Sequence, residues 1–255
     1  MIMSSILSNL MVDLSEYTGK TMADLQVHMD ACRQENKDEW LSIEPQNFAH
    51  TNKFYSSDEN AIYQSTAWLL RDKPMCDIIL SIPVSAAQYG WKTVFDYGAG
   101  IGTPGLVLAE STYVDVTMAD FDCPALSFAK WKAEAYDLPN VRFEHFSDCQ
   151  EVPLIDKPVD CALCIHVIGH SLNPFRTLAE ISTKSKYVVW LNDFRVKENA
   201  EDDLYPMHQR KPDGWDDVWA GVYEPMGHHV QMSTVFGFSA DKYAEKWIGQ
   251  TGWTQ

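Results

Sequence analysis

The stretch "VFDYGAGIGTPG", residues 94–105, decides the fold class, because it joins a short apolar segment to a glycine-rich loop. Two glycine patterns overlap in this stretch. One is G-x-G-x-x-G, the fingerprint that holds the pyrophosphate of a dinucleotide, formed by Gly100, Gly102 and Gly105. The other is D-x-G-x-G-x-G, formed by Asp96, Gly98, Gly100 and Gly102. The two patterns predict different ligands, so their position relative to the preceding strand decides between them.

The position of Asp96 favours the second pattern. A dinucleotide fingerprint puts its first glycine directly after the strand and points the N-terminus of the next helix at a pyrophosphate. Here the strand runs into Asp96, and Gly100 follows four residues later. A carboxylate at the strand end would repel a pyrophosphate, whereas it suits a ligand that carries a sulfonium and an ammonium group and no phosphate.

Strand-like and helix-like segments alternate on both sides of this loop. The expected strands cover residues 93–97, 114–120, 141–146, 159–165 and 186–193. The expected helices between them cover residues 103–110, 123–136 and 173–182. This alternation implies right-handed βαβ units. The fold class expected is therefore α/β, a doubly wound and mostly parallel sheet that binds its ligand at the carboxyl ends of the strands.

Composition limits the partners. The chain of 255 residues is 45% apolar, enough for one substantial core, and carries a net charge of −16. That charge repels phosphate backbones and anionic lipid, so a small-molecule substrate is expected, with no nucleic acid and no membrane as partner. The six cysteines do not form a disulfide framework, which predicts a cytoplasmic location. Cys161 and Cys164 lie three apart on an expected strand, so they point to opposite faces and cannot share a metal ion.

Two domains are expected. Residues 1–90 have helical patterns and form an N-terminal cap, in which Thr21 and Asp24 make a capping box. The helix after this box carries one apolar face, made of Met22, Leu25, Met29 and Cys32. Residues 91–255 form a Rossmann-like domain. Within it the acidic and aromatic residues 195–228 form either a lid over the substrate or a solvated loop.

Residues 93 to about 193 resemble the class I, Rossmann-like superfamily of S-adenosylmethionine (SAM)-dependent methyltransferases. "VFDYGAGIG" is similar to the first motif of that family, "MADFDCPAL" to the second and "FSDCQEVP" to the third. "CIHVIGHSLNP" resembles the segment after the fourth strand, which lines the methionine end of the cofactor. Four landmarks thus occur in order, which is far more specific than a glycine loop by itself.

The resemblance implies which residues bind SAM. The loop that approaches the methionine and adenosine parts consists of Asp96, Gly98, Ala99, Gly100 and Gly102. Asp120, 22 residues past Gly98, would accept hydrogen bonds from both ribose hydroxyls, and Phe121 would lie against the adenine. Asp148 and Cys149 of the third motif would also lie at the cofactor, where Asp148 receives the adenine amino group.

Two further contacts to the methionine part are expected from the family. Helical caps in this family often provide a tyrosine that reaches the methionine carboxylate, and Tyr55 and Tyr63 are the candidates here. Either tyrosine could instead be a core residue, because both lie at helical spacing. His166, just after the fourth strand, is the other residue expected at this end.

Catalysis by such an enzyme needs little beyond alignment. Methyl transfer from SAM is an in-line displacement at carbon, so the protein mainly aligns nucleophile, methyl and sulfur. A base helps when the acceptor is a hydroxyl or a protonated amine. The candidate catalytic residues are His166 and His170 after the fourth strand and Asp193 at the end of the fifth. The alternative for His170 and Asp193 is that each only caps a turn.

The same histidines lie in a segment similar to the E-x-x-E-H motif of ubiquinone-type O-methyltransferases, in which the acids and the histidine bind a divalent ion. Here His166 replaces the first acid, Gly169 replaces the second, and His170 matches. Hard cations prefer oxygen ligands, so the loss of both acids argues against Mg²⁺. Two histidines could hold a softer metal, but no metal site is predicted.

The C-terminal part departs from the family. The family sheet usually ends with an antiparallel pair of strands after the last helix, whereas residues 239–250 have the pattern of that helix and the sequence ends at Gln255. Either the sheet is short, or residues 229–236 serve as an edge strand, or the chain is truncated. A short sheet would expose an edge that could pair with another subunit in a homodimer.

The predicted function is that of a SAM-dependent methyltransferase, which transfers a methyl group to an O or N atom of a small-molecule acceptor by in-line displacement. The alternatives are a methyltransferase that acts on a peptide or protein, an enzyme that transfers an aminopropyl or other alkyl group, and a non-catalytic SAM-binding protein. A NAD-dependent oxidoreductase agrees least with the position of Asp96.

Overall fold

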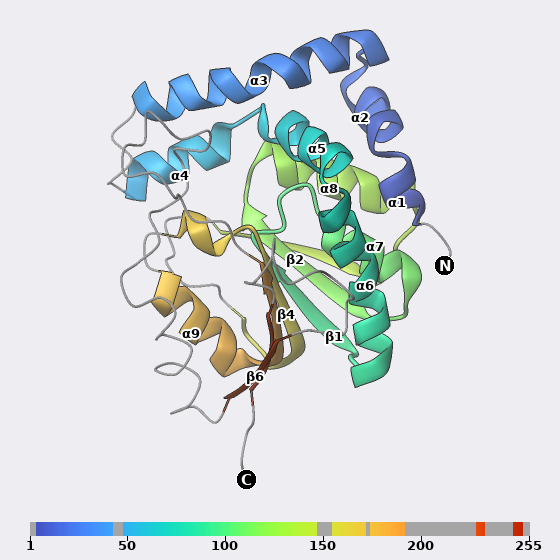
Figure 1. Cartoon of the computed structure of the whole chain (residues 1–255), viewed down its shortest axis with the longest axis vertical. Helices are drawn as coiled ribbons and strands as arrows, with labels where there is room; N and C mark the ends of the chain where they lie inside the picture. The colour runs from blue at the N-terminus through green and yellow to red at the C-terminus, as the bar shows by residue number, and fades with distance from the viewer. Residues whose placement is uncertain are drawn as a thin grey trace.

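A seven-stranded sheet forms the centre of the protein (Figure 1). The computed structural model describes residues 4–42, 48–146, 155–171, 174–191, 228–232 and 247–251. The strands are β1 (Thr93–Tyr97), β2 (Asp115–Phe121), β3 (Val141–Phe146), β4 (Val159–Ile165), β5 (Ser185–Leu191), β6 (His228–Met232) and β7 (Trp247–Thr251). Their order is β3-β2-β1-β4-β5-β7-β6. The first five strands pair in parallel, which confirms the predicted α/β class and the mostly parallel sheet.

Helices precede the sheet and connect its strands. The N-terminal helices are α1 (Ser5–Ser8), α2 (Leu10–Thr18), α3 (Met22–Ser42), α4 (Phe48–Ser57), α5 (Ala61–Arg71) and α6 (Lys73–Tyr89). The connecting helices are α7 (Thr103–Ser111), α8 (Pro124–Ala135), the 3-10 helix η1 (Ile168–His170) and α9 (Pro174–Lys184). Pro104 and Pro124 lie at the starts of α7 and α8, where the missing N–H leaves no helix hydrogen bond unmade. None of the helices in the described part of the chain is long and apolar enough to cross a membrane.

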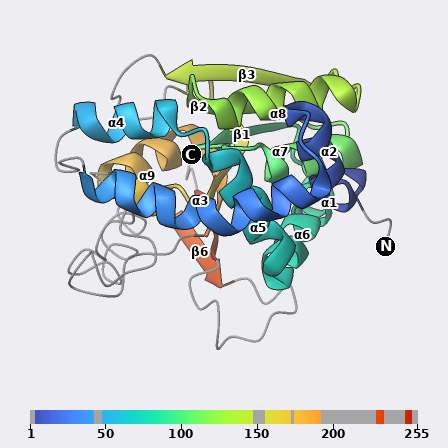
Figure 2. The ribbon, with the colours of Figure 1, turned by 90° about the horizontal axis from the view of Figure 1, so that it is seen from above.

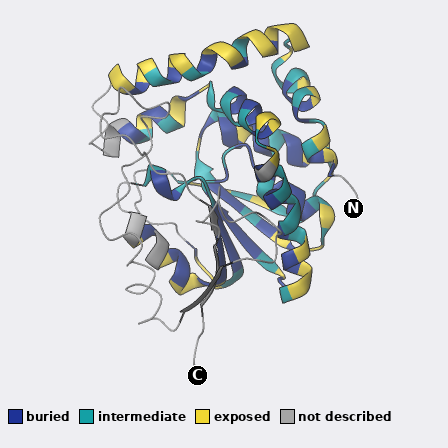
Figure 3. Cartoon of the chain, in the orientation of Figure 1, coloured by how far each residue is buried: buried dark blue, intermediate teal, exposed yellow. Residues whose placement is uncertain are grey.

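Two hydrophobic clusters cover the two faces of the sheet. The larger unites side chains of β1, β2 and β4 with those of α6, α7 and α8 and of the N-terminal helices. The smaller unites the opposite face of the same strands with Ile181 of α9. Figure 3 shows that β1 and β4 are mostly buried between the two clusters. Cys161 belongs to the larger cluster and Cys164 to the smaller, so the prediction that they point to opposite faces is confirmed.

Helices α3, α4 and α5 lie across the carboxyl ends of the strands. Figures 1 and 2 show α3 and α4 above that edge of the sheet, with α5 beneath α3. The two side chains of the capping box predicted for α3 do meet: the backbone N–H of Asp24 donates to Thr21 Oγ1 at 3.2 Å, as in such a box, and the Thr21 hydroxyl donates to the Asp24 carboxylate at 2.7 Å. The buried face of α3 continues beyond Met29 to Asn36 and Trp40. These helices therefore form a roof over the place where a parallel α/β sheet binds ligands.

Two expectations about the chain pattern were wrong. Residues 247–251 form β7 and not the end of a helix, and β7 pairs antiparallel with both β5 and β6. The sheet therefore ends with the antiparallel pair that seemed to be missing, and its edge is β6, which overlaps the segment 229–236 proposed as an edge strand. Met22 was expected on the apolar face of α3 but is 46% exposed, since the buried face begins one turn later at Leu25. The homodimer stays a prediction.

Candidate active site

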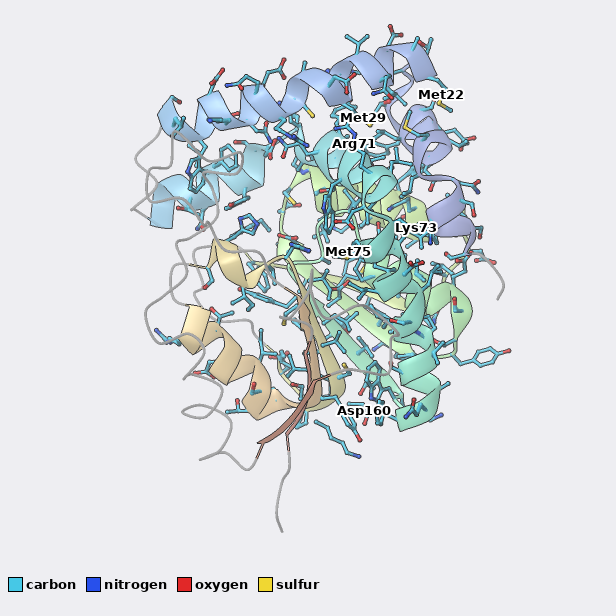
Figure 4. The ribbon with its side chains drawn as sticks, viewed as in Figure 1. Met22, Met29, Arg71, Lys73, Met75 and Asp160 are labelled. Atoms are coloured by element: carbon cyan, nitrogen blue, oxygen red, sulfur yellow. The ribbon has the colours of Figure 1, made fainter. Side chains whose placement is uncertain are left out.

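A cavity of about 340 Å³ separates the carboxyl edge of the sheet from the roof of helices. Its sheet side is lined by Gly98, Ala99, Gly100, Asp120, His166 and His170, among others. Its roof side includes Met29, Arg33, Asn36, Tyr55, Gln64 and Trp68. Arg71 belongs to the roof side as well, and Figure 4 labels both Met29 and Arg71. The volume falls within the range of sites for small molecules and cofactors, about 300–1,000 Å³.

The glycine loop after β1 turns back on itself in left-handed backbone conformations. Gly98, Gly100 and Gly102 have φ values of 66°, 53° and 72°. A residue with a side chain adopts such angles at a cost, which glycine avoids because it has no Cβ. The amides of Gly98 and Ala99 both donate to the carbonyl of Ala119 on β2, at 2.8 and 3.2 Å. The loop is therefore fixed against β2 and presents backbone to the cavity.

Two glycines of the loop should respond differently to alanine. A Cβ at Gly98 would lie 2.1 Å from Val167 Cγ2, whereas a Cβ at Gly100 would meet no atom within 4 Å. We expect Gly98→Ala to lower the free energy of unfolding by about 2–4 kcal/mol, through overpacking and strain together. Gly100→Ala should cost about 1–2 kcal/mol, through the left-handed conformation alone. Urea denaturation of both variants checks this; equal losses would contradict the close contact between the loop and Val167.

Asp96 braces the loop from within. Its side chain is 1% exposed, and Oδ2 accepts a hydrogen bond from the N–H of Gly105, in the first turn of α7, at 3.1 Å. Burial raises the pKa of this carboxyl to about 7, and Asp120 adds to the rise. Asp96 does line the cavity, but its hydrogen bond ties β1 to α7. Asp96 thus has a structural role in holding the loop, in addition to the expected complementarity between its charge and a cationic ligand.

Asp120 and Phe121 end β2 beside the loop. Asp120 Oδ2 accepts from the N–H of Gly100 at 2.6 Å, and Oδ1 accepts from the N–H of Phe121 at 2.7 Å. Burial raises the pKa of Asp120 from its ordinary value of 3.8, while these two hydrogen bonds oppose the rise. Both residues line the cavity next to Gly100. The structure thus brings the predicted ribose-binding acid and the predicted adenine-facing ring together at one end of the cavity.

His166 directly follows β4 in a strained conformation. Its φ is 56°, in the left-handed region that non-glycine residues seldom adopt. The ring of Trp68 from α5 packs against the imidazole edge to face, with centroids 4.5 Å apart. Burial lowers the pKa of His166 to about 4, against an opposing effect of Asp72, so the imidazole is neutral at pH 7. Strain of this kind persists where the surrounding structure enforces it, and it is concentrated at functional sites.

His170 and Tyr55 meet across the cavity from different parts of the chain. The Tyr55 hydroxyl lies 2.6 Å from His170 Nδ1. The Tyr55 ring is edge-on to His170 and nearly parallel to Phe121, with centroids 5.4 and 6.5 Å away. Burial raises the pKa of Tyr55 well above its ordinary value of 10.0, and Asp58 and Asp120 raise it further. The Tyr55 phenol therefore keeps its proton at neutral pH.

Some predicted site residues lie elsewhere. Tyr63 is buried in the larger core cluster and packs against His28, with centroids 4.1 Å apart; it does not line the cavity. Gly102 is the N-cap that precedes α7, where a Cβ would approach Ala129 to 2.8 Å, and it too is absent from the lining. Outside the described residues lie Asp148, Cys149, Asp193 and almost all of the insertion 195–228. Among the described residues, no three His, Cys, Asp or Glu side chains are grouped closely enough to hold a metal ion.

The sequence interpretation missed most of the roof. Asn36, Gln64 and Trp68 line the cavity from α3 and α5 but were not among the predicted site residues. A signal for Asn36 was present, because it lies four residues after Cys32 and so continues the apolar face of α3. A polar residue on an apolar helix face indicates either a buried hydrogen bond or a ligand, and Asn36 Nδ2 does donate to Asp58 Oδ2 at 2.9 Å.

Comparison with known proteins agrees with this geometry. Residues 94–185 match a protein-family model described as "Methyltransferase domain". No curated protein matches the chain. An O-methyltransferase family protein from Burkholderia thailandensis is similar in structure, with a TM-score of 0.55 and 19% identity over 80% of this chain and 61% of that one. A protein from Nostoc punctiforme, described as a candidate O-methyltransferase, is also similar in structure. Its TM-score is 0.54 and its sequence identity is 13%, over 75% of this chain and 59% of that one.

The same fold also hosts other chemistry. The [4+2]-cyclase SpnF is similar with a TM-score of 0.50 and 15% identity, over 63% of this chain and 60% of that one. At these identities the likeness concerns the fold alone. The chain spans about three fifths of the length of all three of these structures. The chemistry performed in the cavity therefore has to be argued from its own residues.

Proposed function

We propose that this chain, whose residues 94–185 are a class I SAM-dependent methyltransferase domain, transfers a methyl group to an oxygen or nitrogen atom of a small-molecule acceptor. The observation that carries the proposal is the cavity, which continues from the glycine loop to the helical roof. The same cavity is lined by the loop, Asp120 and Phe121 and also by His166 and His170. A protein that only binds SAM needs no such histidines in the space that holds the cofactor.

The described residues fit the methyl donor. The open side of Gly100, where a Cβ would meet nothing within 4 Å, lets a ligand approach the backbone. Asp120 offers carboxylate oxygens beside that backbone, suited to the two hydroxyl donors of a ribose. Phe121 offers an aromatic face for adenine. When bound there, SAM supplies an electrophilic methyl group on a sulfonium.

The chain itself would align the acceptor with the methyl group, exclude water from the cavity and accept one proton from the acceptor. The roof helices line one side of the cavity, so an acceptor held between roof and sheet meets less water than it would on an open surface. We assign the role of base to His166 because it lines the cavity and its imidazole is neutral at pH 7; its lowered pKa makes it a weak base, which takes the proton only as the acceptor loses it. Its ring can take the proton that a hydroxyl or ammonium acceptor loses when the new bond forms. Asp193, which lies outside the described residues, is retained as a further candidate for holding the acceptor.

This proposal assigns a role to each of the predicted parts of the chain. Residues 1–90 would act as the cap, which is supported by Tyr55 and Trp68 in the lining of the cavity. Residues 91–255 would provide the cofactor site, with Asp148 and Cys149 at the adenine. Residues 195–228 would close the acceptor side as a lid. Aromatic residues with carboxylates, the composition of that insertion, suit a cationic amine.

The test is a screen for methyl transfer. Purified protein with SAM is offered a panel of hydroxyl- and amine-bearing small molecules, and formation of S-adenosylhomocysteine (SAH) is coupled to the mass of the product. We expect at least one acceptor to gain one methyl group. His166→Gln should lower that rate by about 10²–10⁴-fold, the usual contribution of a base. Its SAH affinity separates the two roles expected of His166, because loss of a contact to the methionine part weakens SAH binding, whereas loss of a base alone leaves it within a few fold of wild type.

Other outcomes would redirect the proposal. Turnover of a peptide and of no small molecule would favour the protein-methylating alternative. Tight SAH binding without any methylated product would favour a non-catalytic SAM-binding protein. Unchanged turnover in His166→Gln, with a verified acceptor, would show that alignment suffices and that His166 is not the base.

A further inference from the structure

We propose that Tyr55 is a positioning residue for His170, whose imidazole it holds with the proton on Nε2. This inference rests on the proposed function for its purpose, because it states which atom His170 offers to a ligand in the same cavity. It goes beyond that function by giving the two histidines opposite roles.

The contact joins the roof to the sheet. Tyr55 lies on α4, and His170 ends η1, 115 residues further along the chain. The 2.6 Å between hydroxyl oxygen and Nδ1 is a short hydrogen bond. The Tyr55 ring is held on other sides by Phe54 and Trp40, with centroids 5.2 and 6.0 Å away. Because these aromatic residues fix the ring, the hydroxyl has little freedom to turn to another partner.

The surroundings decide which atom donates. The pKa of Tyr55 is raised well above its ordinary value of 10.0, so the hydroxyl keeps its proton at neutral pH and needs an acceptor for a hydrogen bond. The carboxylates of Asp58 and Asp120 are close enough to raise that pKa. Among the described residues, however, the atom at hydrogen-bond distance from the hydroxyl is His170 Nδ1, at 2.6 Å, so its lone pair is the acceptor. Tyr55 therefore donates to Nδ1, and a neutral imidazole then carries its proton on Nε2.

The consequence is that the two histidines have different roles, His170 as a hydrogen-bond donor and His166 as a proton acceptor. With its proton on Nε2, His170 offers an N–H to an oxygen atom of a bound ligand and has no lone pair left to act as a base. His166 is neutral at pH 7 because of its burial and can take a proton. Environments that set neighbouring titratable groups to different states in this way assign acid and base roles.

Nitrogen NMR tests the proposal without any acceptor. Two-bond ¹H–¹⁵N spectra of ¹⁵N-labelled protein report which ring nitrogen of each histidine carries the proton, and His170→Gln assigns the signal. We expect wild-type His170 to be protonated at Nε2. In Tyr55→Phe the loss of one hydrogen bond should change the tautomer ratio of His170 by about fivefold or more.

Tyr63→Phe is the matched control, because Tyr63 also packs against a histidine, His28, but not against His170. It should leave the His170 signals unchanged. A wild-type His170 protonated at Nδ1, or a Tyr55→Phe spectrum with an unchanged ratio, would overturn the proposal. The wild-type spectrum decides even if Tyr55→Phe fails to fold. Titration of wild type with SAH separates the two proposals, since absent binding would contradict the proposed function and leave the tautomer result standing.

Discussion

Replacing Asp120 by alanine is expected to weaken the binding of SAM and SAH by about 100-fold or more. A hydrogen bond to a charged group contributes about 1.5–3 kcal/mol, and the ribose offers two such donors. Each 1.4 kcal/mol is tenfold in affinity. The alanine variant also loses the acceptor that Gly100 N–H uses at 2.6 Å, so the loop loses one of its supports. Calorimetric titration with SAM, SAH and NAD⁺ measures the effect.

Asp160→Ala provides the matched control for this experiment. Asp160 also accepts hydrogen bonds from backbone amides, those of Lys92 at 2.7 Å and Thr93 at 3.1 Å. It lies at the amino end of β4, well away from the cavity in Figure 4. We expect Asp160→Ala to lose stability and keep its SAH affinity. Binding of NAD⁺ in place of SAM and SAH would mean that the dinucleotide pattern of the loop is the functional one.

Lys132→Met is expected to make the protein more stable at neutral pH. Lys132 on α8 is fully buried, and its Nζ has no hydrogen-bond partner among the described residues. It lies 4.8 Å above the ring of Phe128. Burial lowers the pKa of Lys132 to about 7, although the charge of Asp13 on α2 opposes this. A methionine fills the same apolar space and carries no charge that has to be buried.

The effect should depend on pH in a defined direction. The unfolded lysine keeps its proton up to its ordinary pKa of 10.5, whereas the folded one loses it above about pH 7. Unfolding therefore takes up a proton between these values, and wild-type stability rises with pH there. Since one pKa unit is 1.36 kcal/mol, the advantage of the variant should reach about 5 kcal/mol below pH 7 and vanish near pH 10.5.

Urea denaturation of wild type and Lys132→Met at several pH values checks this. The control is Lys73→Met, because Lys73 is an exposed lysine whose pair with Asp77 lies on the surface. Its stability should follow wild type at every pH. In Lys132→Met, Asp13 keeps the hydrogen bond from the Tyr136 hydroxyl at 2.8 Å, which limits the disturbance around it. Parallel curves for Lys132→Met and wild type would show that the ammonium is not desolvated.

The sequence predicted the centre of the sheet better than its borders. The third and fourth strands begin and end where the pattern placed them, at residues 141–146 and 159–165. These buried strands carry strong local signals, because apolar residues occupy them and turn residues bound them. The last strand was mistaken for a helix end, since "KWIGQTGW" has no alternating pattern. Pairing with β5 and β6, which is tertiary, decides its conformation.

The site could be predicted from the sequence where a motif determines the backbone conformation. The loop glycines and Asp120 carry a spacing that has a physical reason, and the structure brings Gly98, Gly100 and Asp120 together at one cavity. The roof offered no such spacing. Tyr55 and Tyr63 looked alike in sequence, yet the first lines the cavity and the second is buried in the core. Their difference depends on how α4 and α5 pack on the sheet, which local pattern does not encode.

The position of the first helices in the chain also affects how the protein is made. Helix α1 packs against α7, and α2 packs against α8, which ends at Ala135. The earliest residues to leave the ribosome therefore wait until α8 has been made before their apolar surface is covered. At about 5–20 residues per second this wait is roughly 6–25 s. During it the nascent helices are a substrate for chaperones and proteases, and synonymous changes that slow translation before residue 135 should lower the yield of folded protein.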